Sequence, residues 1–432
     1  MAIPASGAPT VVAVDMGYGH LRAARALADA AGTTMREADR GPLAGIVERA
    51  VWTALRGSYG ALARLAGSGR MGRGPRRLLD ALTGIPRRGT RGSLAEPTGA
   101  VRVLAAFGRA GFGRGLLRAL GSDGAPLVAT FYAQAILADA AGRDRVWLVV
   151  TDSDVNRVWV PARPGDTRIG FLVPCRNTAR RLRSYGVPPD RIRLTGFPLP
   201  PALLGGADLP VLRRDLAARL ARLDPAGAFR ARHGAETEAV LGPIPPPGAG
   251  GPPTVVFSVG GSGAQASLAE PAIEAFRGPV ARGELRLALV AGVHAGVAEA
   301  FRRWLARAGM REGDGVEVLF EPRFASYEPA FNRLLARADV LWTKPGELVF
   351  FAGLGLPLLL APPLGVHERR NRRAALRWGI ALDGRDPAAA PGRLVAALAD
   401  GSLAAAAWRG FRRLPKRGTY RILDIVGRHA GV

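Results

Sequence analysis

Length, composition and charge set broad limits on this chain. Its 432 residues are enough for two domains of ordinary size, or for two and an appendage. The single cysteine, Cys175, excludes an intramolecular disulfide and a cysteine-based zinc site. There is no run of about 20 unbroken apolar residues, so the sequence predicts no membrane-spanning helix. The first residues lack the basic and apolar regions of a signal peptide, which favours a cytoplasmic protein.

The net charge is strongly positive, at +25, and the composition indicates whether this charge serves to bind nucleic acid. A positive surface is the first requirement for binding the phosphates of a nucleic acid. Aromatic residues, which stack on bases in such proteins, make up only 6% of this chain. Only two of the 60 basic residues are lysine, a bias typical of a GC-rich genome. We therefore expect no nucleic-acid partner.

The first half of the chain follows the pattern of a doubly wound α/β domain. An apolar strand at residues 10–14 leads through a glycine-rich turn into a helix, as at the start of such domains. Further apolar runs, of the kind that form buried parallel strands, lie at residues 127–130, 146–151, 167–173 and 191–195. The pattern predicts one Rossmann-like domain over residues 1–205.

The same pattern begins again after a segment rich in glycine and proline. Residues 206–253 contain an amphipathic helix and then GPIPPPGAGGPP, the composition of a linker between domains. A strand at residues 254–259, a second glycine turn and a helix follow it. The remaining apolar runs lie at residues 285–290, 316–320, 338–342 and 357–361. We predict a second Rossmann-like domain over residues 254–400 and a helical tail over residues 401–432.

The first glycine turn places a histidine at the edge of the predicted sheet. Gly17 and Gly19 precede His20, which enters the helix near the carboxyl end of the first strand, where open α/β sheets bind their ligands. Arg22 stands where a dinucleotide-binding fingerprint needs its third glycine, which disfavours NAD. A neutral imidazole can accept the proton of a hydroxyl nucleophile, so His20 is a candidate base. A helix-capping or surface role is the alternative.

A second group of polar residues closes the apolar run at residues 146–151. Thr151 is followed by Asp152, Ser153 and Asp154, which are similar to the Asp-x-Asp motif that holds a divalent metal in another class of sugar transferases. A metal needs further oxygen ligands, and we expect no metal here. The sequence favours a loop that makes polar contacts with a second substrate.

The second half carries the densest set of candidate residues. The turn at Gly260, Gly261, Ser262 and Gly263 lacks the Gly-Lys-Ser/Thr of a nucleoside-triphosphatase loop, but small residues before a helix suit a diphosphate. Two later strand ends present a cation, carboxylates, an imidazole and an amide: Lys344, Gly346, Glu347, His367, Glu368 and Asn371. Such groups suit the phosphates and hydroxyls of a nucleotide sugar. An ordinary solvated loop is the alternative.

Six of these motifs, in order, resemble family 28 of the GT-B glycosyltransferases. That family includes monogalactosyldiacylglycerol synthase, diacylglycerol glucosyltransferases and the N-acetylglucosaminyltransferase that forms lipid II. The matching motifs are Gly17-Tyr18-Gly19-His20, Thr151-Asp152 with Trp159, Thr195-Gly196-Phe197-Pro198, residues 259–265, Thr343-Lys344-Pro345-Gly346, and Gly355-Leu356-Pro357 followed by Glu368 and Asn371.

The resemblance implies a GT-B fold, in which two Rossmann-like domains face a central cleft. It implies an inverting, metal-independent transfer of a sugar from a UDP-sugar to a hydroxyl acceptor such as a lipid, with no cofactor. His20 and Asp152 would be catalytic, and the second glycine turn with Lys344 would bind the diphosphate. The residues on the acceptor side would be Gly17, Gly19 and Thr151. The remaining donor-side residues would be Gly346, Glu347, His367, Glu368 and Asn371.

This chain departs from the family at the donor site. The family's ribose-binding glutamate, counted back from Gly-Leu-Pro, falls on Phe350, because this chain is shorter there. Glu347, one helical turn earlier, is the candidate to replace it, and His367 stands in place of the usual glutamine. Two alternatives to a transferase stay open. One is a nucleotide-sugar epimerase of the same fold, and the other is a catalytically idle protein that binds nucleotide sugar or lipid.

Residues 56–118 form an arginine-rich segment, with thirteen arginines against Asp80 and Glu96. Large apolar side chains accompany them: Trp52, Tyr59, Leu78, Leu79, Phe107, Phe112, Leu116 and Leu117. Basic and apolar groups on one surface suit anionic lipid headgroups, and enzymes of the family often take acceptors embedded in membranes. We therefore expect peripheral binding at the inner face of the plasma membrane. A solvated arginine-rich face is the alternative.

Overall fold

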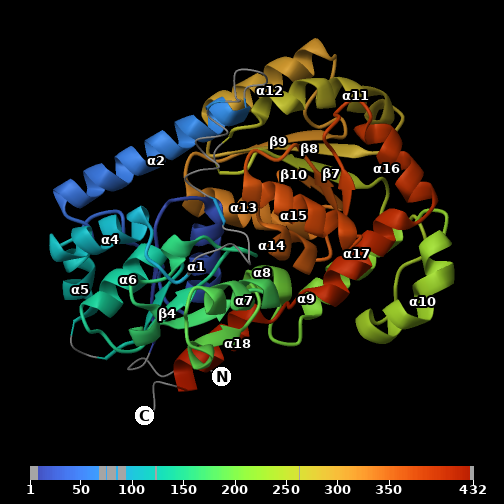
Figure 1. Cartoon of the computed structure of the whole chain (residues 1–432). Coiled ribbons are helices and arrows are strands. Elements are labelled where there is room, and N and C mark those ends of the chain that lie inside the picture. The colour runs from blue at the N-terminus through green and yellow to red at the C-terminus, as the bar shows by residue number, and fades with distance from the viewer. Residues whose placement is uncertain are drawn as a thin grey trace. The chain divides into compact units, whose positions relative to one another are not determined.

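The computed structural model describes residues 8–67, 74, 84–85, 94–121, 124–261 and 263–428, with the backbone alone at residues 63, 64 and 367. The chain divides into two compact units (Figure 1). The first unit comprises Met1–Ala61, Asp80–Pro201 and Pro415–Val432, and the second comprises Leu62–Leu79 and Ala202–Leu414. Each unit is built around its own parallel sheet.

The sheet of the first unit has six parallel strands in the order β2-β1-β3-β4-β5-β6. The strands are β1 (Thr10–Ala13), β2 (Arg36–Glu37), β3 (Leu127–Ala129), β4 (Val146–Val149), β5 (Gly170–Val173) and β6 (Ile192–Leu194). The helices are α1 (Tyr18–Ala30), α2 (Ile46–Gly67, of which Ala61 is the last residue in this unit), α4 (Gly99–Arg109), α5 (Arg114–Leu120), α6 (Tyr132–Ala140), α7 (Arg176–Ser184) and α18 (Gly418–Arg428), with 3₁₀ turns η3 (Arg157–Trp159), η4 (Pro164–Asp166) and η5 (Pro189–Arg191). The strand order reverses between β1 and β3, and doubly wound sheets bind their ligands at such a switch point.

The sheet of the second unit also has six parallel strands, in the order β12-β11-β10-β7-β8-β9. The strands are β7 (Thr254–Ser258), β8 (Arg286–Gly292), β9 (Val316–Phe320), β10 (Val340–Thr343), β11 (Leu358–Leu360) and β12 (Ala381–Asp383). The helices are α8 (Pro201–Leu204), α9 (Pro210–Arg222), α10 (Ala228–Leu241), α11 (Ala269–Ala281), α12 (Ala295–Arg307), α13 (Phe324–Arg337), α14 (Leu348–Gly353), α15 (Val366–Arg377), α16 (Ala390–Ala399) and α17 (Ser402–Arg413), with the 3₁₀ turn η6 (Ala266–Leu268). Here the order reverses between β7 and β10, which lie side by side.

These sheets confirm the predicted class of two Rossmann-like, doubly wound units. Every apolar run that predicted a strand overlaps one, and β3, β4, β5, β7 and β10 are buried along their whole length. This is the burial expected of parallel strands covered on both faces. The sequence did not predict β2 and β12, because both are short and neither coincides with an apolar run.

The segment at residues 206–253 belongs to the second unit. Arg219 of α9 is buried and donates hydrogen bonds to the carbonyl oxygens of Leu335, Ala338 and Leu354, at the ends of α13 and α14. Burial lowers the pKa of this guanidinium to about 10. The glycine- and proline-rich loop that follows α10 is tied to the same unit, since Arg230 donates to the Pro245 carbonyl.

The predicted C-terminal tail is divided between the units, because α17 belongs to the second and α18 to the first. In the first unit, α18 packs against α1. Its first residue, Gly418, fits closely against the backbone at Phe197, where an added Cβ would lie 2.2 Å from the carbonyl oxygen. Among the described residues, no helix has both the length and the apolar character needed to cross a membrane.

Candidate functional site

Polar groups from both sequence-predicted sites lie at the switch points of the two sheets. In the first unit, the turn after β1 leads into α1, whose third residue is His20, and β3 ends next to Thr130. In the second unit, the turn after β7 carries Gly260, and β10 ends next to Lys344. Since parallel strands end at the same edge of a sheet, each pair of loops meets at one edge.

His20 is held in a defined orientation by the neighbouring strand end. Gly17 adopts φ 129°, a conformation that favours glycine, and α1 begins at the next residue. The Nδ1 atom of His20 lies 2.7 Å from the carbonyl oxygen of Thr130. Because a carbonyl oxygen only accepts hydrogen bonds, Nδ1 carries the proton, and the lone pair of the neutral ring is on Nε2.

Aromatic side chains surround this imidazole. The ring of Phe131 meets His20 edge-on with 5.0 Å between centroids, and the ring of Trp159 lies 5.9 Å away. Tyr132 packs against both aromatic neighbours, and burial raises the pKa of its hydroxyl to about 12. Sequence reasoning missed Phe131 and Tyr132. The signal that could have found them is their position directly after the strand at residues 127–130.

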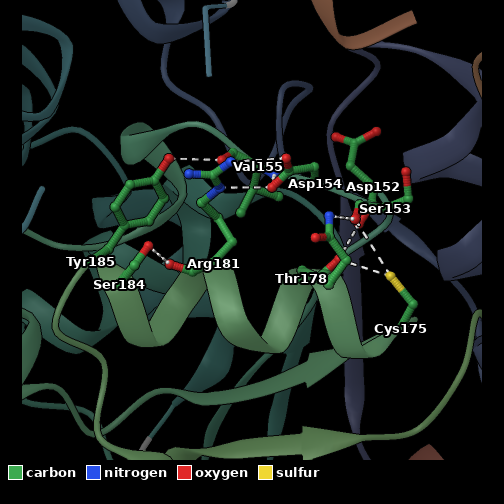
Figure 2. A network of polar contacts seen from close by, with 10 residues as sticks. Asp152, Ser153, Asp154, Val155, Cys175, Thr178, Arg181, Ser184 and Tyr185 are labelled. Atoms are coloured by element: carbon green, nitrogen blue, oxygen red, sulfur yellow. Dashed lines mark hydrogen bonds and ion pairs between the residues drawn. The ribbon is translucent and has the colours of Figure 1, made fainter. Parts of the chain in front are cut away.

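The structure brings Thr151 next to His20, with 3.3 Å between Thr151 Oγ1 and His20 Nδ1. Asp152 follows it and is exposed. Figure 2 shows the Asp152 carboxylate directed away from α7, while its carbonyl oxygen accepts a hydrogen bond of 2.9 Å from Thr178. Side chains of α7 therefore anchor the backbone of this loop, and the Asp152 carboxylate points away from that helix.

The next carboxylate in the loop has a different role. Asp154 forms a two-point ion pair with Arg181 of α7, with 2.8 Å from Nε to Oδ1 and 3.1 Å from Nη2 to Oδ2. Tyr185 of the loop that follows α7 donates to the Val155 carbonyl. Both Asp154 oxygens are thus bonded to Arg181, so Asp152 and Asp154 do not present paired carboxylates. Among the described residues, no cluster of three or more metal-binding side chains occurs.

The second glycine turn has the backbone arrangement of an anion site. Gly260 and Gly263 adopt φ 68° and φ 62°. The carbonyl oxygens of Gly260, Gly261 and Gly263 accept hydrogen bonds from Gly263 N, His294 Nε2 and Ala266 N. Within the described part of the chain, the N–H groups of Gly260 and Gly261 make no hydrogen bond. An anion binds where backbone N–H groups can donate to it and where the nearby carbonyl oxygens, which would repel it, are bonded within the protein. Ser262 lies outside the described residues.

Lys344 packs against this turn and is ion-paired to the first turn of α15, the helix that follows the next strand. Its Cε would lie 3.4 Å from a Cβ added at Gly260. Its Nζ lies 3.3 Å from Glu368 Oε1, and the other oxygen of Glu368 accepts a 2.7 Å hydrogen bond from Leu364 N. The Glu368 side chain is only 3% exposed, whereas that of Lys344 is 26% exposed. Glu368 is therefore placed to hold the ammonium group rather than to meet solvent.

The other donor-side candidates lie on the loop between β10 and α14 or against it. Asn371 donates from Nδ2 to the Pro345 carbonyl at 3.0 Å, so it supports the loop that carries Gly346. Glu347 is half-buried at the start of α14. Phe350, the position that the resemblance gives to a ribose-binding glutamate, is fully buried. The side chain of His367 lies outside what the structure describes.

His294 is a further group at this edge that sequence reasoning missed. It follows β8, on the side of β7 opposite β10. Its Nε2 lies 3.0 Å from the Gly261 carbonyl oxygen. The glycine turn is thus flanked by Lys344 on one side and His294 on the other. A histidine four residues after the apolar run at residues 285–290, in a chain with only five histidines, is the signal that could have found it.

The arginine-rich segment is described only in part, and residues 78 and 79 lie outside the described residues. Arg56 donates to both Asp15 and Asp39, at 2.9 and 2.8 Å, so its charge is used within the unit. Trp52 and Leu116 are core residues. The expectation that these two contribute to an exposed apolar surface is wrong, because both belong to the buried core of the first unit.

No family model matches this chain, and no curated protein matches it in sequence. Among solved structures, the chain is similar to a Listeria monocytogenes protein assigned as a UDP-N-acetylglucosamine 2-epimerase, at 13% identity over 76% of this chain and 79% of that chain, with a TM-score of 0.45. It is similar to the glycosyltransferase SnogD of Streptomyces nogalater, at 15% identity over 98% and 100% of the two chains, with a TM-score of 0.43. It is also similar to HepE of Anabaena, solved in complex with UDP, at 11% identity over 77% and 82%, with a TM-score of 0.39.

Proposed function

We propose that this protein is a metal-independent glycosyltransferase of GT-B type that moves a sugar from a UDP-sugar to a hydroxyl acceptor. The observation that carries the proposal is the second glycine turn. The carbonyl oxygens of Gly260, Gly261 and Gly263 are bonded within the protein, and Lys344 packs against the turn. Among the described residues, the N–H groups of Gly260 and Gly261 have no hydrogen-bond acceptor. Backbone N–H groups beside an ammonium suit a diphosphate.

On the donor side, the diphosphate is the leaving group, so negative charge builds on it in the transition state. The Gly260 and Gly261 N–H groups and Lys344 Nζ stabilise that charge where it develops. Glu368 keeps the ammonium in place, since its buried carboxylate lies 3.3 Å from Nζ. Glu347, half-buried at the start of α14, takes the hydroxyls of the donor's ribose.

On the acceptor side, His20 is the base. The hydrogen bond from Nδ1 to the Thr130 carbonyl leaves the ring's lone pair on Nε2, which takes the proton of the acceptor hydroxyl. The acceptor oxygen then bonds to the anomeric carbon from the face opposite the diphosphate. The bond from that carbon to the diphosphate oxygen breaks, its electron pair leaves with UDP, and the sugar inverts. Asp152 orients the acceptor through its exposed carboxylate.

The membrane surface is part of the same proposal, because the acceptor of such a transferase can be a lipid. On α2, Val47, Leu55 and Tyr59 are exposed at 72%, 45% and 37%, and Leu55 and Tyr59 lie one turn apart on the same face of the helix. On α4, Val103 and Phe107 are exposed one turn apart. Arginines 102, 109, 114 and 118 are exposed on α4 and α5. Exposed apolar side chains and exposed arginines on the helices of one unit fit an anionic bilayer.

A thermal-shift screen tests the donor. We expect UDP and UDP-sugars to raise the melting temperature and ADP to raise it less, because a ligand that binds only the native state stabilises it by mass action, by ~2.7 kcal/mol at a hundred times Kd. No shift with any nucleotide or nucleotide sugar overturns the proposal. Incubation with the best donor and no acceptor then separates the alternatives. An epimerised sugar indicates an epimerase, whereas a transferase releases UDP once a hydroxyl acceptor is added.

Co-sedimentation with phosphatidylglycerol vesicles tests the membrane surface. We expect binding at low salt that weakens at high salt, as screening of arginine–lipid attraction requires. The variant Leu55→Ser should bind less, while Leu194→Ser, a matched change at a 45% exposed leucine of β6, should not differ from the parent protein. Equal binding to neutral phosphatidylcholine vesicles, or none at low salt, contradicts this part.

A further inference from the structure

His294 is a side chain that controls the backbone of the second glycine turn. We infer that it is a positioning residue, which holds the Gly261 carbonyl away from the anion and thereby keeps the turn in its diphosphate-binding form. The expected effect on UDP affinity rests on the function proposed above, whereas the expected effect on the turn itself does not.

The imidazole is fixed at one end by the helix that it precedes. His294 is the N-cap residue of α12, and its own carbonyl oxygen accepts hydrogen bonds from Val297 N and Ala298 N at 3.1 and 3.2 Å. Because α12 has 13 residues, it fixes the position of the His294 backbone. The side chain extends from there to the turn, where Nε2 lies 3.0 Å from the Gly261 carbonyl oxygen. Because that oxygen can only accept, Nε2 is the protonated nitrogen and the donor.

The ring also packs against the turn. An added Cβ at Gly263 would lie 3.4 Å from His294 Cδ2 and 3.6 Å from Cγ and Nε2. Gly263 adopts φ 62°, so it has the conformation and the lack of side chain that this close packing uses. His294 thus meets the turn through both a hydrogen bond and a ring contact.

The turn needs this support because it is built of glycines. Glycine populates positive and negative φ with little difference in energy, so the peptide groups around Gly261 can rotate more easily than those of other residues. If a peptide group rotates so that its carbonyl oxygen faces the diphosphate, the partial negative charge of that oxygen repels the anion, whereas the N–H group would attract it. The Gly260 and Gly263 carbonyls are bonded to backbone N–H groups of the turn and its continuation, whereas the Gly261 carbonyl is bonded to a side chain. The hold on Gly261 can therefore be removed by one substitution.

Two substitutions separate the hydrogen bond from the packing. His294→Phe keeps a ring of similar size and removes the donor. His294→Gln keeps an N–H donor at a comparable reach and removes the ring. His233→Phe is the matched control, since His233 is a half-exposed histidine on α10 of the same unit, away from the turn.

The test is hydrogen exchange by mass spectrometry on the peptide that covers residues 259–266, without ligand, followed by titration with UDP. We expect His294→Phe to speed exchange in this peptide roughly five- to tenfold, the factor equivalent to one neutral hydrogen bond, and to raise Kd for UDP by about the same factor. His294→Gln and His233→Phe should stay close to the parent protein in both measurements, and all variants should melt within a few degrees of it.

Unchanged exchange in His294→Phe overturns the inference, whatever UDP does. Equal effects of His294→Phe and His294→Gln overturn it as well, because the hydrogen bond would then not be the cause. Failure of the parent protein to bind UDP overturns the proposed function instead, and the exchange result still decides whether His294 holds the turn.

Discussion

Lys344 is the residue whose two roles at the proposed donor site can be separated by experiment. It packs against the glycine turn, and its Nζ lies 3.3 Å from the buried carboxylate of Glu368. Lys344→Met therefore removes a cation from the proposed diphosphate site and also breaks the ion pair with Glu368. Weaker UDP binding in this single variant therefore has two explanations. Either the diphosphate has lost a cation, or the broken ion pair has destabilised the fold.

The expected magnitudes differ for the two roles. Loss of a hydrogen bond to a charged group costs about 1.5–3 kcal/mol, which raises Kd for UDP roughly 10- to 150-fold. Breaking a buried ion pair costs about 3–5 kcal/mol of stability when both partners are buried. Here the Lys344 side chain is 26% exposed, so water compensates part of the lost ion pair. We therefore expect Lys344→Met to lower the free energy of unfolding by about 1–3 kcal/mol.

The double variant Lys344→Met with Glu368→Gln separates these effects. A neutral amide can still accept the hydrogen bond from Leu364 N, so stability in urea should return to within about 1 kcal/mol of the parent protein. The affinity for UDP, measured by calorimetry, should remain as low as in the single variant. Lys416→Met is the control, because it removes the chain's other lysine, in the first unit. A double variant that binds UDP as tightly as the parent protein refutes the diphosphate role of Lys344.

Three further predictions concern the first unit. His20→Ala should lower turnover about 10²–10⁴-fold with little change in UDP affinity, as expected for a positioned base; retained kcat would assign His20 to structure alone. Gly418→Ala should lower the urea midpoint, since its Cβ would lie 2.2 Å from the Phe197 carbonyl oxygen, whereas Gly427→Ala in the same helix, with no atom within 4 Å, should raise or preserve it. Burial raises the pKa of Glu48, so the native state binds its proton more tightly than the unfolded state does, and stability falls as pH rises above about 4.5. Glu48→Gln can still accept the hydrogen bond from Gly113 N, and its melting temperature should rise relative to that of the parent protein between pH 4 and pH 7. A difference in melting temperature between the two proteins that does not change with pH would contradict this.

The strands were predictable because buried parallel strands are continuous apolar runs. The run at residues 254–259 contains β7, and that at 146–151 contains β4. The pair Arg36–Glu37 of β2 carries no such signal, since two charged residues at a sheet edge look like any loop. Arg219 is a similar case, because nothing in an arginine-rich helix distinguishes the one guanidinium that is buried and bonded to four carbonyls.

The candidate site was predictable in its residues but not in its pairings. Strand ends identify Lys344 and the glycine turn, because parallel strands end at a common edge. That Glu368 pairs with Lys344, and that Asn371 supports the Pro345 carbonyl, depends on how helices and loops far apart in sequence pack together. The hydrogen bond from His294 to Gly261 belongs to the same class, since it joins residues that follow different strands.

The central claim is that the second glycine turn binds the diphosphate of a nucleotide sugar, and a crystal structure of the protein with UDP tests it most directly. We predict diphosphate oxygens within hydrogen-bond distance of Gly260 N, Gly261 N and Lys344 Nζ. UDP bound elsewhere, such as beside His20 in the first unit, or a carbonyl oxygen of the turn facing the phosphates, would contradict the claim.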